Sequence, residues 1–213
     1  MTITADALSA GLGIAPGQAA SLVERLNEGV DRFNILNPSL WVANLSHESG
    51  RFGRLEENLN YSVEALLSLF GRHRISAEDA AKYGRSAAHP ADQEALADIL
   101  YGGDFGRKNL GNTEPKDGSK FKGRSWPQLT GRAAYRELGL SLPFDKPLLD
   151  APEALAEPKY GGLAGGWFWT WKRCNQVARE PEAVRRRWNG GTFGLAEVLA
   201  HYDKLREAGC PSA

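Results

Sequence analysis

Apolar residues recur every three to four positions along much of the chain, which is the spacing of one face of a helix. One helix is predicted to start at Asn37 and Pro38. Asn37 can cap a helix, and Pro38 occupies a first-turn position that needs no amide donor. Gly50 is a suitable end because glycine readily adopts the left-handed conformation. The earliest periodic segment covers residues 15–36, with the apolar residues Leu22, Val23, Leu26, Val30 and Phe33.

Further helices are predicted from local start and stop signals. Ser62 can cap a helix that reaches Phe70, and Ser76-Ala77-Glu78-Asp79 resembles a capping box. Few segments alternate apolar and polar residues with period two, so strands should be scarce and the fold class is predicted to be mainly α. The remaining helices are expected at Pro90 to Tyr101, Pro127 to Leu138, from Asp150 onwards, at Pro181 to Asn189, and at Leu195 to Ala208.

Two segments depart from ordinary helical patterning. Residues 102–123 are glycine-rich and charged, and a loop of about twenty residues without structure tends to be functional or disordered. We therefore expect either a wall or lid of a cleft or a mobile loop. Residues 160–174, YGGLAGGWFWTWKRC, combine small and aromatic side chains, which favours close helix packing over an exposed sugar-stacking platform.

The size and charge of the chain narrow its function classes. Its 213 residues fit one domain, which we divide into a helical part over residues 1–36 and a core over residues 37–208. The 26 basic residues balance 26 acidic ones, so no nucleic-acid partner is expected. The run Arg185-Arg186-Arg187 is interpreted as a solvated helix face rather than a polyanion site.

The N-terminus and the cysteines indicate in which cellular compartment the protein is expected. Residues 1–21 have no positive n-region and no long apolar core, so they do not resemble a Sec signal peptide. No run approaches the roughly 20 apolar residues that a membrane span requires. Cys174 and Cys210 form neither a disulfide framework nor a zinc site, so we expect reduced, buried thiols, with a single bridge as the alternative.

Candidate chemistry centres on Glu48, which shares a helix face with Trp41 and Leu45. Burial raises the pKa of a carboxyl group and keeps it protonated, as a general acid near neutral pH requires. His47-Glu48 also begins the zinc-protease motif, but position 51 holds arginine instead of the second histidine, so no metal is expected. Paired carboxylates remain, Glu48 with Glu56 or Glu57, as glycoside hydrolysis requires.

Four ordered motifs resemble family 19 of the glycoside hydrolases, which includes chitinases and bacteriophage endolysins. The catalytic segment of that family is similar to LSHESGRF followed by LEENLNYS. The other motifs are Tyr101-Gly102-Gly103, then Phe121-Lys122-Gly123-Arg124 with Gln128-Leu129-Thr130-Gly131-Arg132 and Tyr135, then Asn189-Gly190-Gly191-Thr192 with Gly194-Leu195-Ala196. The resemblance spans about residues 40–205. It implies a lysozyme-like, two-lobed helical domain with a central substrate cleft.

The resemblance also implies residue roles. Glu48 matches the general acid and Glu57 the general base that activates water, with the adjacent Glu56 as the alternative base. The family inverts anomeric configuration without a cofactor, which requires the two carboxyl groups to lie about 6.5–9.5 Å apart. Thr130 matches a hydroxyl that helps hold the attacking water. The residues implied in substrate contact or hydrogen bonding at the site are Asn60, Tyr61, Gln128 and Asn189.

Four positions depart from the family pattern. Ser125 stands where glycine is usual and costs backbone freedom, and Pro127 removes an amide donor but can begin a helix. Ala134 replaces a common asparagine, and Val198 replaces an arginine that often follows the G-L-A segment. These departures bear on substrate contacts and leave the expected acid and base in place.

The motif details favour a lysin over a secreted chitinase. The sequences E-E-N-L-N-Y-S and T-G-R, together with the absence of a recognisable signal peptide, resemble the small phage and prophage lysins. We therefore expect a monomer that cleaves peptidoglycan glycan strands, is made in the bacterial cytoplasm, and reaches the wall after a membrane lesion or by export. The alternatives are a chitinase acting on N-acetylglucosamine polymers and a weakly active wall-binding protein.

Overall fold

The computed structural model describes residues 2–213, and these residues are mainly helical. Within that range no extended strand forms, and the only β pairing consists of three isolated bridges. The predicted mainly α class is therefore confirmed. The chain folds as two compact units: unit 1 contains Met1–Leu55, Ser125–Gln128 and Leu155–Ala213, and unit 2 contains Glu56–Arg124 and Leu129–Ala154.

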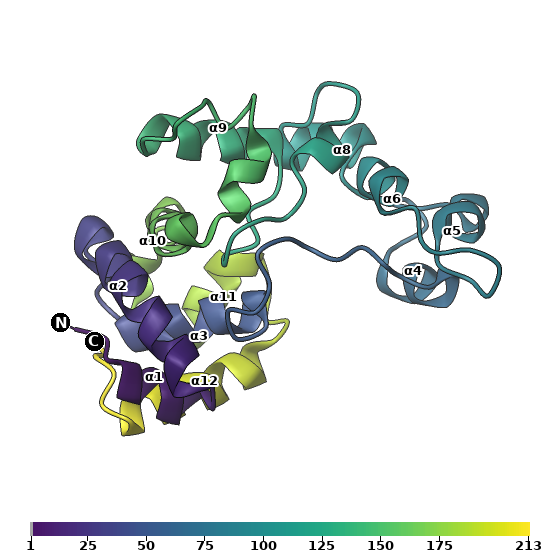
Figure 1. The fold of residues 1–213 in the computed structure, drawn as a ribbon. Helices are drawn as coiled ribbons and strands as arrows, with labels where there is room; N and C mark the ends of the chain where they lie inside the picture. Colours follow the sequence, from purple (N-terminus) through teal and green to yellow (C-terminus); the bar gives the residue numbers. More distant parts are fainter. Residues whose placement is uncertain (1) are drawn as a thin grey trace. The chain divides into compact units, whose positions relative to one another are not determined.

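Unit 1 is a bundle built around four helix pairs (Figure 1). Helix α2 packs against α10, α3 packs against α12, and α1 contacts both α2 and α12. None of the helices in the described range is both long and apolar enough to cross a bilayer. The helices of unit 1 are α1 (Ala5–Leu12), α2 (Pro16–Phe33), α3 (Pro38–Ser49), α10 (Gly161–Trp171), α11 (Pro181–Asn189) and α12 (Leu195–Glu207), with short 3-10 turns η3 (Pro158–Tyr160) and η4 (Cys174–Val177).

Glycines bring α2 and α10 into backbone contact. A Cβ atom on Gly162 would clash with the carbonyl oxygen of Arg25, and one on Gly29 would lie 2.5 Å from the carbonyl oxygen of Gly162. Trp169, on the same helix as Gly162, is completely buried. The prediction that the glycine and aromatic segment serves close helix packing is confirmed.

Helix α3 runs through the interior of unit 1 and presents its last turn at the surface. The Asn37 side chain accepts a hydrogen bond from the Leu40 amide (3.2 Å), and Gly50 ends the helix with φ +58°. Trp41 and Leu45 are completely buried, whereas Glu48 is half-buried. The predicted start, end and apolar face of this helix are therefore confirmed, and they fix where Glu48 emerges.

Unit 2 has its own apolar core beneath shorter helices. Ser62 and Ser76 cap α4 and α5 as predicted, because their hydroxyls accept hydrogen bonds from the Ala65 and Asp79 amides. The core cluster consists of Leu59, Leu66, Ile75, Ala80, Leu96, Ala97 and Leu100. The helices are α4 (Val63–Leu69), α5 (Ala77–Tyr83), α6 (Gln93–Leu100), α7 (Gly103–Phe105), η1 (Gly106–Leu110, a π-helix), α8 (Asp117–Lys120) and α9 (Arg132–Ser141).

Residues 102–123 are not without structure, contrary to the sequence pattern. They form α7, η1 and α8, and the Asp117 carboxylate holds them together. It accepts hydrogen bonds from the amides of Thr113 and Glu114, and two more from the Arg132 side chain at 2.7 and 2.6 Å. Such an arrangement depends on one buried acid rather than on periodicity, so the sequence pattern does not reveal it.

Three predicted helix starts were misplaced. The helix expected at Pro127 begins at Arg132, because Ser125 and Gln128 adopt positive φ values of +63° and +52°, which no helix contains. The helix expected at Pro90 begins at Gln93, capped by the Asp92 side chain. The helix expected from Asp150 onwards is only a 3-10 turn, η2 (Pro152–Ala156).

The two cysteines are free and buried, as expected. Burial raises the pKa of the Cys174 thiol to about 12. Both thiols are therefore structural, because a reactive cysteine needs an accessible thiolate.

Candidate active site

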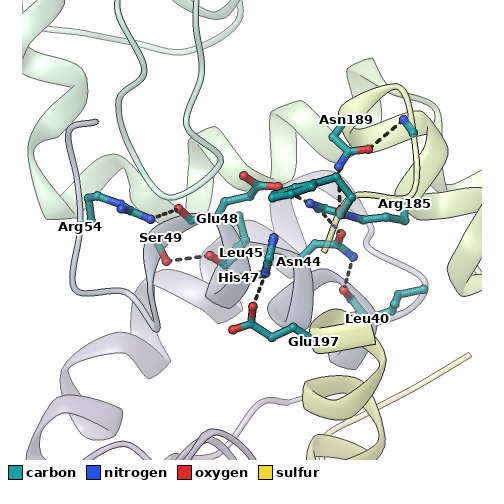
Figure 2. A network of polar contacts seen from close by, with 12 residues as sticks. Leu40, Asn44, Leu45, His47, Glu48, Ser49, Arg54, Arg185, Asn189 and Glu197 are labelled. Atoms are coloured by element: carbon teal, nitrogen blue, oxygen red, sulfur yellow. Dashed lines mark hydrogen bonds and ion pairs between the residues drawn. The ribbon is translucent and has the colours of Figure 1, made fainter. Parts of the chain in front are cut away.

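Glu48 ends the buried helix α3 and faces an arginine (Figure 2). Its Oε1 accepts a hydrogen bond from Arg185 at 2.7 Å, and its side chain is 22% exposed. Within residues 2–213, Oε2 makes no hydrogen bond. Spacing along the helix predicts apolar surroundings for this carboxyl, and that expectation was wrong, because a guanidinium from α11 lies beside it.

Arg185 is buried, with only 1% of its side chain exposed. It also donates to the Asn44 side chain (3.1 Å) and to the Phe193 carbonyl (2.8 Å). A buried guanidinium requires satisfied donors, and Glu48, Asn44 and the Phe193 carbonyl accept its hydrogen bonds. The interpretation of the arginine run as a solvated face was therefore wrong for Arg185, although Arg186 is exposed and pairs with Glu182.

The turn between α11 and α12 joins this network through Asn189. The Asn189 side chain donates to the Phe193 carbonyl (3.0 Å) and accepts from the Gly191 amide (2.9 Å). Since Arg185 and Asn189 both bind the Phe193 carbonyl, the turn lies beside Glu48 (Figure 2). The structure thus brings two sequence-predicted site residues, Glu48 and Asn189, into one polar network.

His47 connects the end of α3 to α12. Its Nδ1 lies 2.8 Å from Glu197 Oε2, and its ring lies so close to Gly194 that a Cβ atom there would clash with it. Gly194 also has φ +74°, so both space and backbone conformation require glycine at this position. Burial lowers the pKa of His201, the second histidine near Glu197, although the charge of Glu197 acts in the opposite direction.

In unit 2, both carboxylate oxygens of Glu57 have hydrogen-bond donors. The Tyr101 hydroxyl donates to Oε2 at 2.6 Å, and the Gly123 amide donates to Oε1 at 2.5 Å. The Glu57 amide donates in turn to the Gly123 carbonyl (2.9 Å). Burial, followed by the charge and hydrogen bond of Glu57, raises the pKa of Tyr101, which stays a donor. Two of the resemblance motifs, those of Tyr101 and Gly123, therefore meet at Glu57. The sequence did not indicate that Tyr101 binds this carboxylate.

Glu56, the alternative base, occupies a different environment. Its two oxygens pair with Lys122 at 2.5 Å and Arg124 at 3.0 Å. Partial burial would raise the pKa of Glu56, but the hydrogen bonds and charges of Lys122 and Arg124 outweigh it and lower that pKa. Glu56 is thus held as a carboxylate between two cations.

The other predicted site residues are divided between the units. Thr130 and Tyr61 are half-buried in unit 2, and Asn60 is exposed there, with its amide donating to the Asn58 side chain (2.9 Å). Gln128 belongs to unit 1, where its side chain donates to the Ser125 carbonyl (2.9 Å). Unit 1 therefore carries Glu48, Gln128 and Asn189, and unit 2 carries Glu57, Asn60, Tyr61 and Thr130.

Ser125 and Val198, two of the departures from the family pattern, are both buried. Ser125 adopts φ +63°, a left-handed conformation that favours glycine, and its buried hydroxyl has no hydrogen-bond partner among the described residues. Val198 is completely buried on α12. This chain therefore has a buried valine where the resemblance places an arginine, and a buried arginine at position 185.

Each unit contains one carboxyl group of the kind that acid–base chemistry requires. Glu48 has one oxygen fixed and one unbonded, and Glu57 is oriented by two donors. In the described part of the chain, no group of three or more His, Cys, Asp or Glu side chains is placed to hold a metal ion.

Comparison with known proteins identifies the family. No family model matches the chain. A protein of Haemophilus influenzae named glycosyl hydrolase family 19 domain-containing protein is 30% identical over 176 residues, which are 81% of this chain and 80% of that protein. The mainly helical structure is consistent with the lysozyme-like helical fold that the resemblance implies. The chain therefore belongs to glycosyl hydrolase family 19 and is a glycoside hydrolase.

Proposed function

We propose that this glycoside hydrolase cleaves the glycan strand of peptidoglycan by a single displacement that inverts the anomeric carbon. The observation that carries the proposal is the Glu48 carboxyl group, which has one oxygen bound by buried Arg185 and the other without a partner in the described chain. No cofactor is required, because inverting hydrolysis uses only an acid, a base and water.

Glu48 acts as the general acid. Its Oε2 gives a proton to the oxygen of the leaving sugar while Arg185 holds Oε1. The attraction between a guanidinium and a carboxyl group strengthens as the carboxyl loses its proton, so this contact is stronger in the transition state than in the ground state. Arg185 thereby assists the proton transfer and keeps the carboxyl group in one orientation.

Glu57 acts as the general base. It takes a proton from the water that attacks the anomeric carbon, while Tyr101 and the Gly123 amide fix its orientation. Thr130, in the same unit, helps to hold that water, as the resemblance implies. The ion pairs of Glu56 with Lys122 and Arg124 favour Glu57 over Glu56 in this role.

The substrate assignment rests on the motifs around these residues. The E-E-N-L-N-Y-S segment and the T-G-R segment resemble the small lysins of the family more than its secreted chitinases. We place the action of the enzyme at the bacterial cell wall, reached after a membrane lesion or by export. Incubation with purified sacculi and with chitin oligomers, followed by mass analysis of the products, separates a lysin from a chitinase.

A lysis assay tests the catalytic assignment. Purified protein should clear suspensions of outer-membrane-permeabilised cells, and both Glu48→Gln and Glu57→Gln should abolish clearing while thermal unfolding stays cooperative. Full lysis by the Glu48→Gln protein would contradict the mechanism. A wild-type protein that binds sacculi and releases no muropeptides would instead indicate a wall-binding protein.

A further inference from the structure

Phe193 is an exposed aromatic residue beside the candidate acid. The residue is 82% exposed, the highest value among the large apolar residues that the structure describes as exposed. Single exposed apolar side chains are common on protein surfaces, so exposure alone implies no function. What distinguishes Phe193 is how its backbone is held.

The backbone of Phe193 is fixed by two donors and by its neighbour. Its carbonyl oxygen accepts hydrogen bonds from Arg185 (2.8 Å) and from Asn189 (3.0 Å). The next residue, Gly194, adopts φ +74° against the His47 ring. The backbone of the turn is therefore held by side chains of α3 and α11, and the phenyl ring extends into solvent.

The same guanidinium joins the backbone of Phe193 to the acid. Arg185 binds the Phe193 carbonyl through Nε and the Glu48 carboxylate through its terminal nitrogen. The phenyl ring also meets the ring of His47 edge to face, with centroids 6.4 Å apart, and His47 directly precedes Glu48. Phe193 and Glu48 are thus connected through Arg185, whose contact with Glu48 is drawn in Figure 2.

We propose that Phe193 binds substrate by stacking its ring on the apolar face of an N-acetylated hexose next to the glycosidic oxygen that Glu48 protonates. This inference rests on the proposed function. A pyranose ring has an apolar face of C–H groups and a polar rim, and binding sites join such a face to an aromatic ring with polar groups close by. Here the polar groups are Glu48 and Asn189. Because the turn is already ordered, little conformational entropy is lost on binding.

A second exposed aromatic residue is less well placed. Trp171 is 46% exposed and stacks on Trp167 with centroids 5.0 Å apart, at the end of α10. Its ring contacts involve Trp167, Phe168 and Lys172, and none of these residues binds Glu48. Trp171 therefore lacks the connection to the acid that Phe193 has.

Binding without cleavage tests the proposal directly. In a Glu48→Gln background, Phe193→Ala should weaken co-sedimentation with purified sacculi by roughly tenfold, and Phe193→Trp should restore it. Leu140→Ala is the matched control, because Leu140 is 79% exposed on α9 in unit 2, away from this turn in sequence and unit. It should bind as the Glu48→Gln parent does.

Kinetics of the active protein provide a second readout. With Glu48 intact, Phe193→Ala should raise KM more than it lowers kcat, because the ring contacts sugar and takes no part in proton transfer. Unchanged binding of the Phe193→Ala, Glu48→Gln protein would overturn the proposal. If the wild type cleaves chitin oligomers and leaves sacculi intact, the peptidoglycan assignment fails, and the same variants measured on an N-acetylglucosamine hexamer still decide the role of Phe193. Binding of neither polymer by the parent would overturn both.

Discussion

The guanidinium of Arg185 donates a hydrogen bond of 2.7 Å to Glu48, and only 1% of the Arg185 side chain is exposed. A buried ion pair contributes little to stability on balance, because desolvation of the charges offsets their attraction. Its value here is geometric, since it selects which oxygen of Glu48 stays unbonded. The same arginine also binds Asn44 and the Phe193 carbonyl, so one side chain orders the acid and the neighbouring turn.

Arg185→Met should lower turnover about tenfold or more, because loss of a hydrogen bond to a charged group costs about 1.5–3 kcal/mol. Release of reducing sugar from sacculi, measured beside thermal unfolding, checks this. The turnover of Arg185→Lys should fall between those of the wild type and Arg185→Met, since a lysine keeps the charge but loses the planar set of donors. Arg186→Met is the control, because Arg186 is exposed and pairs only with Glu182 in the described chain. Wild-type turnover by Arg185→Met would show that the contact has no catalytic role.

Tyr101→Phe should lower turnover about tenfold, because it removes one of the two donors that orient Glu57 and keeps the aromatic ring. Steady-state rates at saturating substrate are the measurement. Glu57→Gln should be inactive, whereas Glu56→Gln should retain most activity, since Glu56 is occupied by Lys122 and Arg124. The reverse pattern, an inactive Glu56→Gln and an active Glu57→Gln, would assign the base to Glu56.

Gly162→Ala should destabilise unit 1 by about 1–3 kcal/mol or more, because the added methyl group clashes with the Arg25 carbonyl and forces α2 and α10 apart. Denaturant unfolding gives the free energy. Gly17→Ala on α2 is the matched control: a Cβ atom there meets nothing within 4 Å, and alanine should stabilise the helix by about 0.5 kcal/mol. Equal stability of the two variants would contradict the close backbone contact.

Asp117 should make stability depend on pH in the acid range. Burial would raise the pKa of Asp117, but hydrogen bonds from Arg132 and from the Glu114 amide outweigh it and lower that pKa below its usual 3.8. Between the lowered pKa and 3.8 the unfolded chain binds more protons than the folded one, so stability rises with pH through this window. The contribution of Asp117 to stability is complete above the unfolded pKa and is lost as pH falls through the folded pKa.

Melting temperatures of the wild type and Asp117→Asn, measured from about pH 2 to about pH 7, test this dependence. Asp117→Asn should be less stable at neutral pH, and the difference should shrink as the pH approaches 2. A difference that stays constant over the whole range would show that the ionised form of Asp117 contributes nothing.

Local signals predicted helix ends well and backbone reversals poorly. Asn37, Gly50 and Gly190 act within a few residues of the ends that they fix, so the bounds of α3 and the end of α11 could be read from the sequence. Before α9, Ser125 and Gln128 adopt left-handed conformations. A serine and a glutamine carry no local signal for that conformation, and the predicted helix therefore began too early.

In the candidate site too, residues with local sequence signals could be predicted and residues that depend on distant partners could not. Glu48 and Asn189 could be located from motifs, because each belongs to a short stretch with distinctive neighbours. Arg185 and Tyr101 could not be assigned roles, because their partners are 137 and 44 residues away in the chain. In the sequence, Arg185 belongs to a run of three arginines, and only tertiary packing separates the buried member from the exposed Arg186.

Mass spectrometry of reduced muropeptides from purified sacculi tests the central claim most directly. The wild-type protein should release products with one new reducing-end sugar for each cut and with intact stem peptides, and the product sugar also identifies the linkage that is cleaved. Glu48→Gln and Glu57→Gln, both folded, should release none. The account is contradicted if Glu48→Gln releases the same products as the wild type, or if the wild type cuts only the peptides.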